Sequence, residues 1–133
     1  MSDNRVTPLN TPSAPPVAGP YSAAVRAGDW VVLAGQVGMD PATGRFVDGG
    51  TREQCLQVLD NISRVLADCG LTLSNVAKAT VFVTDLGDFG VINEAYAAAF
   101  GDHKPARSTV QVAALPGGAS VEIEVWAYAP SKV

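Results

Sequence analysis

The chain has 133 residues, of which 47% are hydrophobic and 17% charged, and its formal net charge is −4. This length suits one domain with a core of its own. The acidic balance, without a cluster of Lys and Arg that could neutralise several phosphates, makes nucleic acid an unfavourable partner. No stretch has the length and apolar character of a signal peptide or a membrane span, so we expect a cytoplasmic protein without a membrane partner.

The first twenty residues are rich in proline, at positions 8, 12, 15, 16 and 20. Proline lacks an amide donor and interrupts regular structure, so we predict an extended or disordered arm over residues 1–13 and a single domain over residues 14–133. Because residues 1–12 offer few apolar anchors, their removal is expected to leave the melting temperature nearly unchanged. Residues 23–26 and 30–36, joined by a turn at 27–29, predict a β-hairpin.

A helix is predicted to follow Thr51, which is a suitable N-cap with Gln54 reaching back to complete a capping box. Apolar residues recur at helical spacing as far as Cys69, and Gly70 is well placed after the last turn. The two cysteines, Cys55 and Cys69, would lie roughly 21 Å apart on this helix, which excludes a disulfide between them. They indicate buried thiols in a reducing compartment.

Residues 76–84 predict the next strand, and Asp85 or Asp88 is expected to cap a second helix that ends near Phe100. Four residues of this helix share one face at helical spacing: Phe89, Asn93, Tyr96 and Phe100. An amide among three aromatic rings is unusual for an apolar stripe. It indicates either a satisfied structural asparagine or a group of a binding site.

Residues 105–128 contain two segments that alternate with the period of a β-strand. The first places Arg107, Thr109 and Gln111 on one face, and Val110 and Val112 on the other. The second alternates Val121, Ile123 and Val125 with Glu122, Glu124 and Trp126. We expect the apolar residues to face the core and Arg107 to face away from the helices. The five-residue link most simply makes a hairpin, although the strand order stays open.

Arg107 and Glu122 are the candidate chemical groups of these strands. An arginine fork binds a small carboxylate through two parallel hydrogen bonds, and a nearby glutamate can hold or deprotonate a water molecule. The alternative is a structural ion pair or two solvated side chains. His103 is the only histidine and has no evident carboxylate partner, so a histidine-based nucleophilic device is not expected. The pattern of His, Cys and carboxylates offers no metal-ligand spacing.

The sequence around these residues resembles the signature of the reactive intermediate deaminase family, also called the Rid or YjgF-like family. It consists of PARSTVQVAALP followed by VEIE, with GPYS, AGQ and INEAY upstream. The resemblance covers roughly residues 14–128. It implies an α+β, chorismate-mutase-like fold with a mixed β-sheet, two helices on one face, and a homotrimer that has three clefts between its subunits.

The activity that the resemblance implies is hydrolysis of reactive 2-imino acids and enamines, such as 2-aminoacrylate, to 2-keto acids and ammonia. Arg107 would clamp the substrate carboxylate, and Glu122 would orient the attacking water. Tyr21, Asn93 and Thr109 would shape the pocket or bond the substrate. A protonated imine is already electrophilic, so no cofactor or metal is implied.

Thr109 departs from the family pattern, because many relatives have Cys at this position, and the departure concerns the substrate preference. Two alternative functions remain. One is a non-catalytic 2-keto-acid-binding or regulatory module on the same fold. The other, less favoured for an acidic chain, is a ribonuclease or translation inhibitor.

Overall fold

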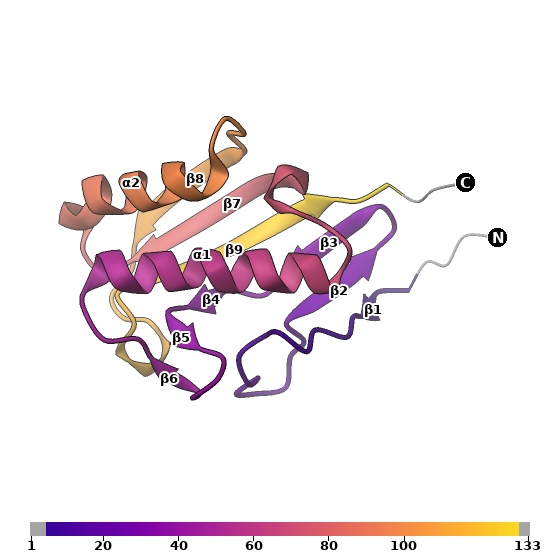
Figure 1. Cartoon of the computed structure of the whole chain (residues 1–133), viewed down its shortest axis with the longest axis horizontal. Coiled ribbons are helices and arrows are strands. Elements are labelled where there is room, and N and C mark those ends of the chain that lie inside the picture. Colours follow the sequence, from indigo (N-terminus) through magenta and orange to yellow (C-terminus); the bar gives the residue numbers. More distant parts are fainter. Residues whose placement is uncertain (1–4, 131–133) are drawn as a thin grey trace.

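The computed structural model describes residues 5–130, which form a mixed β-sheet and two helices (Figure 1). The main sheet has the strand order β1-β2-β3-β9-β7-β8, and β4 also pairs with β9. Its strands are β1 Thr7–Pro8, β2 Ala24–Ala27, β3 Trp30–Leu33, β4 Gln36–Val37, β7 Val76–Val83, β8 Ala106–Gln111 and β9 Val121–Tyr128. A separate hairpin joins β5 (Met39–Asp40) to β6 (Arg45–Phe46), and the helices are α1 (Thr51–Asp68) and α2 (Phe89–Phe100).

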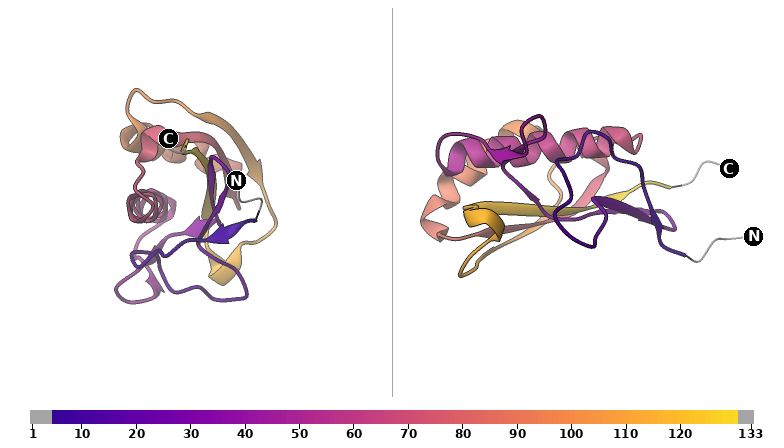
Figure 2. Two further views of the ribbon diagram at one scale, coloured as in Figure 1. Left: turned by 90° about the vertical axis from the view of Figure 1, so that its right-hand side faces the viewer. Right: turned by 90° about the horizontal axis from the view of Figure 1, so that it is seen from below.

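Both helices cover the same face of the sheet, which confirms the predicted α+β architecture (Figure 2). The core lies between these layers, where β9 contributes Val121, Ile123 and Val125 and α1 contributes Val58 and Ile62, all with 0% exposure. The opposite face, which we call the open face, carries three large aromatic side chains, and the ring of Trp30 makes edge-on contacts with those of Trp126 and Tyr128. The exposed fractions of Trp30, Trp126 and Tyr128 are 37%, 46% and 47%.

The predicted hairpin of residues 23–36 is confirmed, because β2 and β3 pair antiparallel through the turn between Ala27 and Trp30. The predicted hairpin of the last two strands is wrong. β7 lies between β8 and β9, parallel to β8 and antiparallel to β9. The helix α2 returns the chain to the start of β7 and so makes β8 its parallel neighbour. The central position beside β7 is then left to β9, whose alternate residues are fully buried.

The helix α1 begins one residue earlier than predicted, because Gly50 and not Thr51 is the N-cap. The carboxylate of Glu53 accepts a hydrogen bond from the Gly50 amide at 2.8 Å. Gln54 is used elsewhere, since its side-chain oxygen accepts from the Ser120 amide at 3.0 Å. The start of α1 is thereby tied to the segment that precedes β9. At the other end Gly70 has a φ of 77°, which confirms its predicted place after the last turn.

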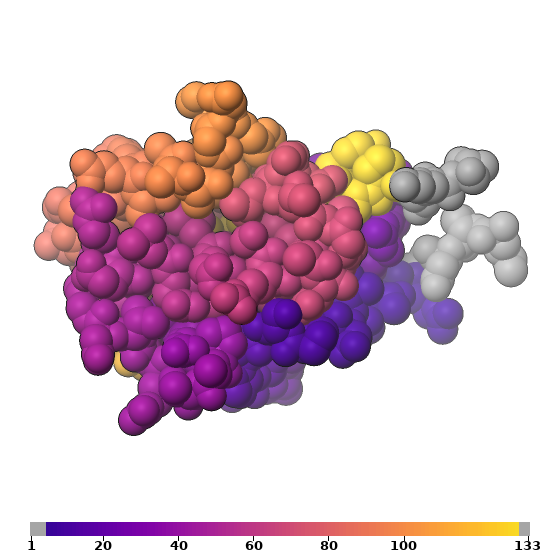
Figure 3. All heavy atoms as spheres, in the orientation of Figure 1, coloured from indigo at the N-terminus to yellow at the C-terminus, as the bar shows by residue number. Residues whose placement is uncertain are grey.

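Most of the predicted arm is attached to the domain, apart from residues 1–4, which lie outside the described residues together with residues 131–133. β1 pairs with β2, the Leu9 amide donates to the Ala24 carbonyl at 3.0 Å, and Leu9 packs against the core. In the space-filling view the indigo N-terminal segment lies against α1 (Figure 3). Removal of residues 1–12 should therefore lower the melting temperature, in contrast to the expectation from the sequence. The domain boundary at residue 13 stays a prediction.

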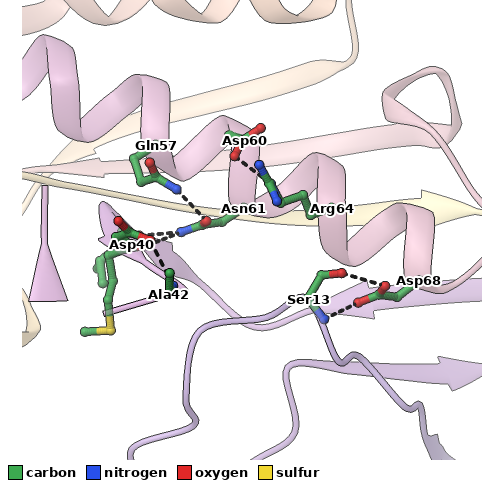
Figure 4. A network of polar contacts seen from close by, with 10 residues as sticks. Ser13, Asp40, Ala42, Gln57, Asp60, Asn61, Arg64 and Asp68 are labelled. Atoms are coloured by element: carbon green, nitrogen blue, oxygen red, sulfur yellow. Dashed lines mark hydrogen bonds and ion pairs between the residues drawn. The ribbon is translucent and has the colours of Figure 1, made fainter. Parts of the chain in front are cut away.

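Asp68, in the last turn of α1, anchors the arm through both of its carboxylate oxygens (Figure 4). The amide and the hydroxyl of Ser13 each donate to it at 2.8 Å. We expect Asp68→Ala to lower the free energy of unfolding by roughly 1–2 kcal/mol, because the loss of two hydrogen bonds to a charged acceptor exceeds the relief of a negative charge at a helix C-terminus. Chemical denaturation measures this difference.

Asp60 offers the matched control on the same helix. Its exposed carboxylate pairs with Arg64 at 2.8 Å, one helical turn away. Such a surface pair contributes little, so Asp60→Ala should change the free energy of unfolding by less than about 0.5 kcal/mol. Equal effects of the two substitutions would show that the arm does not stabilise the domain through Asp68.

Candidate functional site

Arg107, on β8, is held against α2 by three contacts. Its Nη2 donates to Oδ1 of Asn93 at 2.6 Å. The guanidinium also lies over the rings of Tyr96 and Phe89, with its central carbon 4.8 and 5.5 Å from their centroids. Tyr96 in turn stacks on Phe100 with centroids 4.5 Å apart. The aromatic stripe predicted on the second helix therefore holds the guanidinium of Arg107 in place. The asparagine within the stripe, Asn93, accepts a hydrogen bond from it.

These contacts leave most of the N–H donors of the Arg107 guanidinium available to a ligand. Of the five N–H donors of an arginine, only one of Arg107 has a partner among the described residues. A hollow beside it is lined by Tyr96, Lys104 and Pro105, among others. Two positive groups, Arg107 and Lys104, border this hollow, so it suits a small anion such as a carboxylate. We call it the arginine half-site.

The expected orientation of β8 is wrong. Val110 was predicted to face the core, yet it is 42% exposed and lies on the open face. Arg107 and Thr109 lie on the face that the helices cover. Alternation tells which residues share a face, but β8 is an edge strand whose helix-side neighbour is the aromatic stripe of α2 rather than aliphatic core. The Oγ1 of Thr109 is buried without a hydrogen-bond partner among residues 5–130.

Glu122, on β9, lines a second hollow together with Tyr21 and Gln36. Tyr21 is exposed, and its hydroxyl accepts a hydrogen bond of 3.4 Å from the Ala18 amide. Burial, with a smaller contribution from Glu124, raises the pKa of the Glu122 carboxyl above its ordinary value. A carboxylate of raised basicity beside a hollow can accept a proton from water. We call this place the glutamate half-site.

Gly35 allows the Glu122 carboxylate to lie against the backbone that connects β3 to β4. A Cβ at this position would be 2.8 Å from Cδ and 2.9 Å from Oε2 of Glu122. Real Cβ atoms do not approach other atoms so closely, so the carboxylate holds this place only because residue 35 has no side chain.

The two half-sites lie on opposite faces of the sheet. Arg107 is the register partner of Ala79, which also pairs with Val125 of the buried core face. Glu122 is the partner of Phe82, which also pairs with the exposed Val110. Directly paired residues point to the same face, so one chain cannot bring the guanidinium and the carboxylate together. The structure unites Arg107 with Asn93, and Tyr21 with Glu122, as two separate pairs.

Sequence reasoning missed several residues of these half-sites. Tyr96 and Phe89 were recognised as a stripe but not as the partners of an arginine. Gly35 carried a usable signal, because a glycine inside a predicted strand indicates close approach of another group. Gln36 carried another, because it is a polar residue in the predicted apolar strand of residues 30–36, and the structure buries it. Lys104 gave no signal, since a lysine in a loop is common.

The remaining polar candidates do not join either pair. His103 lines the arginine half-site, but its Nε2 is 2.7 Å from the Val76 carbonyl oxygen and is used in that hydrogen bond. Among residues 5–130, no group of three or more His, Cys, Asp or Glu side chains could hold a metal ion. In the same range, neither helix is long and apolar enough to cross a membrane.

Comparisons with known proteins match almost the whole chain. The model of the family described as endoribonuclease L-PSP matches residues 11–129. A mouse 2-iminobutanoate/2-iminopropanoate deaminase is 45% identical over 116 residues, which are 87% of this chain and 86% of the mouse protein. The crystal structure of RidA from an Antarctic Psychrobacter is 43% identical, with a TM-score of 0.86 over 90% of this chain and 97% of that one. The structure of TdcF from E. coli with bound serine is 38% identical, with a TM-score of 0.86 over 92% and 98%.

Proposed function

Because this chain belongs to the endoribonuclease L-PSP family, which is the YjgF/RidA family, we propose that it is a deaminase that hydrolyses reactive 2-imino acids and their enamines to 2-keto acids and ammonia. The observation that carries the proposal is that α2 holds the guanidinium of Arg107 in place while most of its N–H donors stay available to a carboxylate. The serine bound to the E. coli relative supports it, since serine also presents a carboxylate beside a nitrogen-bearing carbon.

The chemistry needs few groups. The protonated imine carbon is electrophilic, so water can attack it once the water is oriented and gives up a proton. Arg107 holds the carboxylate, and Asn93 and Tyr96 hold Arg107. Glu122 accepts the proton of the water as the new C–O bond forms. It then returns this proton to the nitrogen of the tetrahedral adduct and accepts the proton of the adduct's hydroxyl group as the C–N bond breaks and the C=O bond of the keto acid forms. The leaving ammonia takes that proton and departs as ammonium.

A complete site requires two copies of the chain, since the half-sites lie on opposite faces of the sheet. We therefore propose a homotrimer in which the open face packs against a neighbouring copy and the arginine half-site of one subunit meets the glutamate half-site of the next. The exposed aromatic side chains of the open face, Trp30, Trp126 and Tyr128, support this assembly. A head-to-tail interface of this kind closes into a ring when the rotation permits it.

The direct test is an assay in which an amino-acid oxidase generates the imine and the release of ammonia and keto acid is followed. The protein should accelerate hydrolysis above the spontaneous rate, and light scattering should give three times the chain mass. Binding of a 2-keto acid without faster ammonia release would instead identify the non-catalytic module. A stable monomer at micromolar concentration would contradict the composite site.

Gly35 provides a test of the position of the Glu122 carboxylate. Gly35→Ala should leave the fold intact, because the clashing atoms belong to the end of a flexible side chain, but it should displace the carboxylate and lower kcat by roughly 10-fold. Gly90→Ala is the matched control, since a Cβ there meets nothing within 4 Å. It should leave kcat unchanged and, as a glycine inside α2, stabilise the protein by roughly 0.5–1 kcal/mol. Unchanged kcat in Gly35→Ala would mean that the carboxylate position is not critical.

RNA cleavage is the less favourable function, although the family description names an endoribonuclease. The net charge of −4 repels a polyanion, and the ring nitrogen Nε2 of the only histidine is engaged with a backbone carbonyl. The proposed location is the cytoplasm, where a reducing environment suits the two free cysteines, Cys55 and Cys69.

A further inference from the structure

The hollow beside Glu122 is mostly apolar. It has a volume of about 240 Å³, and its polar side chains are those of Tyr21, Gln36 and Glu122. The rest of the wall is aliphatic or aromatic and comes from three separate segments, with Val17 before β2, Met39 and Phe46 on the β5–β6 hairpin, and Pro116 before β9. This volume exceeds the needs of one water molecule beside a carboxylate.

The walls of this hollow are fixed by contacts that the reaction itself does not require. The fully buried amide of Asn61 on α1 donates to the backbone carbonyls of Val37 and Met39, at 3.3 and 2.8 Å (Figure 4). Gln57 donates to the oxygen of the same amide at 2.8 Å. These bonds hold the start of the hairpin at a set distance from α1, so the hollow is preformed.

Phe46, on β6, also lines the hollow. Its ring lies over Gly117, where a Cβ would be 2.7 Å from the ring carbon Cε2. Gly117 has a φ of 66°, which also favours glycine. The base of the hairpin, where Phe46 pairs with Met39, thereby rests on the Pro116–Gly118 turn, and one aromatic ring forms part of the wall of a cavity that contains a carboxylate.

Resting on the proposed function, we propose that this hollow is a subsite for the substrate side chain and makes the enzyme prefer 2-imino acids with larger apolar side chains. The carbon that water attacks carries the nitrogen, the carboxylate and the side chain. The carboxylate goes to Arg107 of the neighbouring subunit, and the reacting carbon lies next to Glu122. The side chain then enters the apolar space bordered by Met39 and Phe46. The side chains of imines derived from leucine or methionine reach its apolar walls, whereas the methyl group of the alanine-derived imine makes little contact with them.

The charge of the subsite adds a second selection. No Lys or Arg lines the hollow among the described residues, and Glu122 lies at its border. An acidic side chain would bring a second negative charge next to this carboxylate, in a partly dehydrated space. The imine derived from glutamate should therefore be a poor substrate.

The test is a panel of imines generated by amino-acid oxidases from alanine, 2-aminobutyrate, leucine, methionine and glutamate. An extra methylene in an apolar pocket is worth roughly 10-fold or more in kcat/KM, so the leucine-derived imine should exceed the alanine-derived imine by at least about 10-fold. The glutamate-derived imine should be the slowest. This order of kcat/KM values can be measured on the wild-type protein alone.

Phe46→Ala tests the assignment of the wall. It should lower the ratio of kcat/KM for the leucine-derived over the alanine-derived imine by roughly 10-fold. Leu56→Ala is the matched control, because Leu56 is an apolar residue of α1 that is 47% exposed and remote from this hollow. Leu56→Ala should leave this ratio of kcat/KM unchanged. The ratio for Phe46→Leu should lie between those of the wild-type protein and Phe46→Ala. Assembly of each variant is checked by light scattering.

The outcomes separate the two proposals. Wild-type protein that hydrolyses none of the imines would overturn the proposed function. Wild-type protein that hydrolyses all of them equally, or the alanine-derived imine fastest, would overturn the subsite and leave the function standing. An unchanged ratio in correctly assembled Phe46→Ala would also overturn the subsite.

Discussion

Arg107→Ala should lower kcat/KM for a 2-imino acid by roughly 10²- to 10⁴-fold. A bidentate guanidinium–carboxylate pair contributes roughly 3–5 kcal/mol to the binding of the transition state, and alanine removes both hydrogen bonds. The measurement is steady-state kinetics on an enzymatically generated imine. Arg107→Lys should recover little, because an ammonium group cannot reproduce the planar pair of donors or its position over the rings of Tyr96 and Phe89.

Arg64→Ala is the charge-matched control for this experiment. Arg64 is exposed on α1 and pairs only with Asp60 among residues 5–130, so its loss should leave kcat/KM unchanged. Arg107→Ala should keep its oligomeric state and lose little stability, since a cation–π contact contributes roughly 0.5–1 kcal/mol at partly exposed sites. Wild-type kinetics in a correctly assembled Arg107→Ala protein would mean that the carboxylate is bound elsewhere.

The second large effect is expected for Glu122→Gln, which keeps the shape of the side chain but cannot accept a proton. We expect kcat to fall by roughly 10²-fold with KM little changed, because the carboxylate acts on the water and not on the bound substrate. Unaltered kcat would remove Glu122 from the mechanism. Melting and light scattering show whether the variant is assembled.

The pH dependence gives an independent check of the same carboxylate. Burial first and Glu124 second raise the pKa of Glu122, so the base becomes protonated, and kcat falls, as the pH is lowered through this raised pKa. Glu124→Gln removes one of the two causes, lowers the pKa of Glu122 and should move the acidic limb of the profile to lower pH. The positive charge of the neighbouring Arg107 acts in both proteins, so the direction of the difference is unaffected.

Mixing the two inactive variants tests the composite site. In trimers assembled at random from equal amounts of Arg107→Ala and Glu122→Gln chains, about a quarter of the interfaces join an intact arginine half-site to an intact glutamate half-site. The mixture should therefore regain about a quarter of the wild-type activity after the chains are unfolded and refolded together. No recovery would place both residues in one chain's site and contradict the proposed assembly.

The elements with strong local signals could be predicted from the sequence. The β2–β3 hairpin has its turn between two alternating segments, and both helices have an apolar period and a terminal glycine, Gly70 or Gly101. The pairing of β8 could not be predicted in the same way. Its neighbour β7 is separated from it by the whole of α2, and a short link to β9 is compatible with either arrangement.

The residues of the candidate site could be predicted from the sequence, but their positions relative to the sheet could not. The family signature pointed to Arg107 and Glu122, yet periodicity alone gave Arg107 the wrong face, because nothing in β8 itself states which side an edge strand turns to the helices. Asn61 was overlooked inside the apolar stripe of α1, although its position three residues after Val58 places it on the buried side. Its role depends on the carbonyls of Val37 and Met39, which no local pattern links to α1.

The pKa values of the two cysteine thiols bear on how readily the protein reacts with its own electrophilic substrate. Burial raises the pKa of the Cys55 thiol to about 11, with the nearby Arg107 acting in the opposite direction. The pKa of Cys69 is also raised, by burial and by Asp68, with Arg26 opposing. Both thiols stay protonated at neutral pH, and it is the thiolate that reacts with electrophiles such as an imine. Position 109, on the same face of β8 as Arg107, carries a threonine, so the chain offers no readily ionised thiol to an electrophilic substrate.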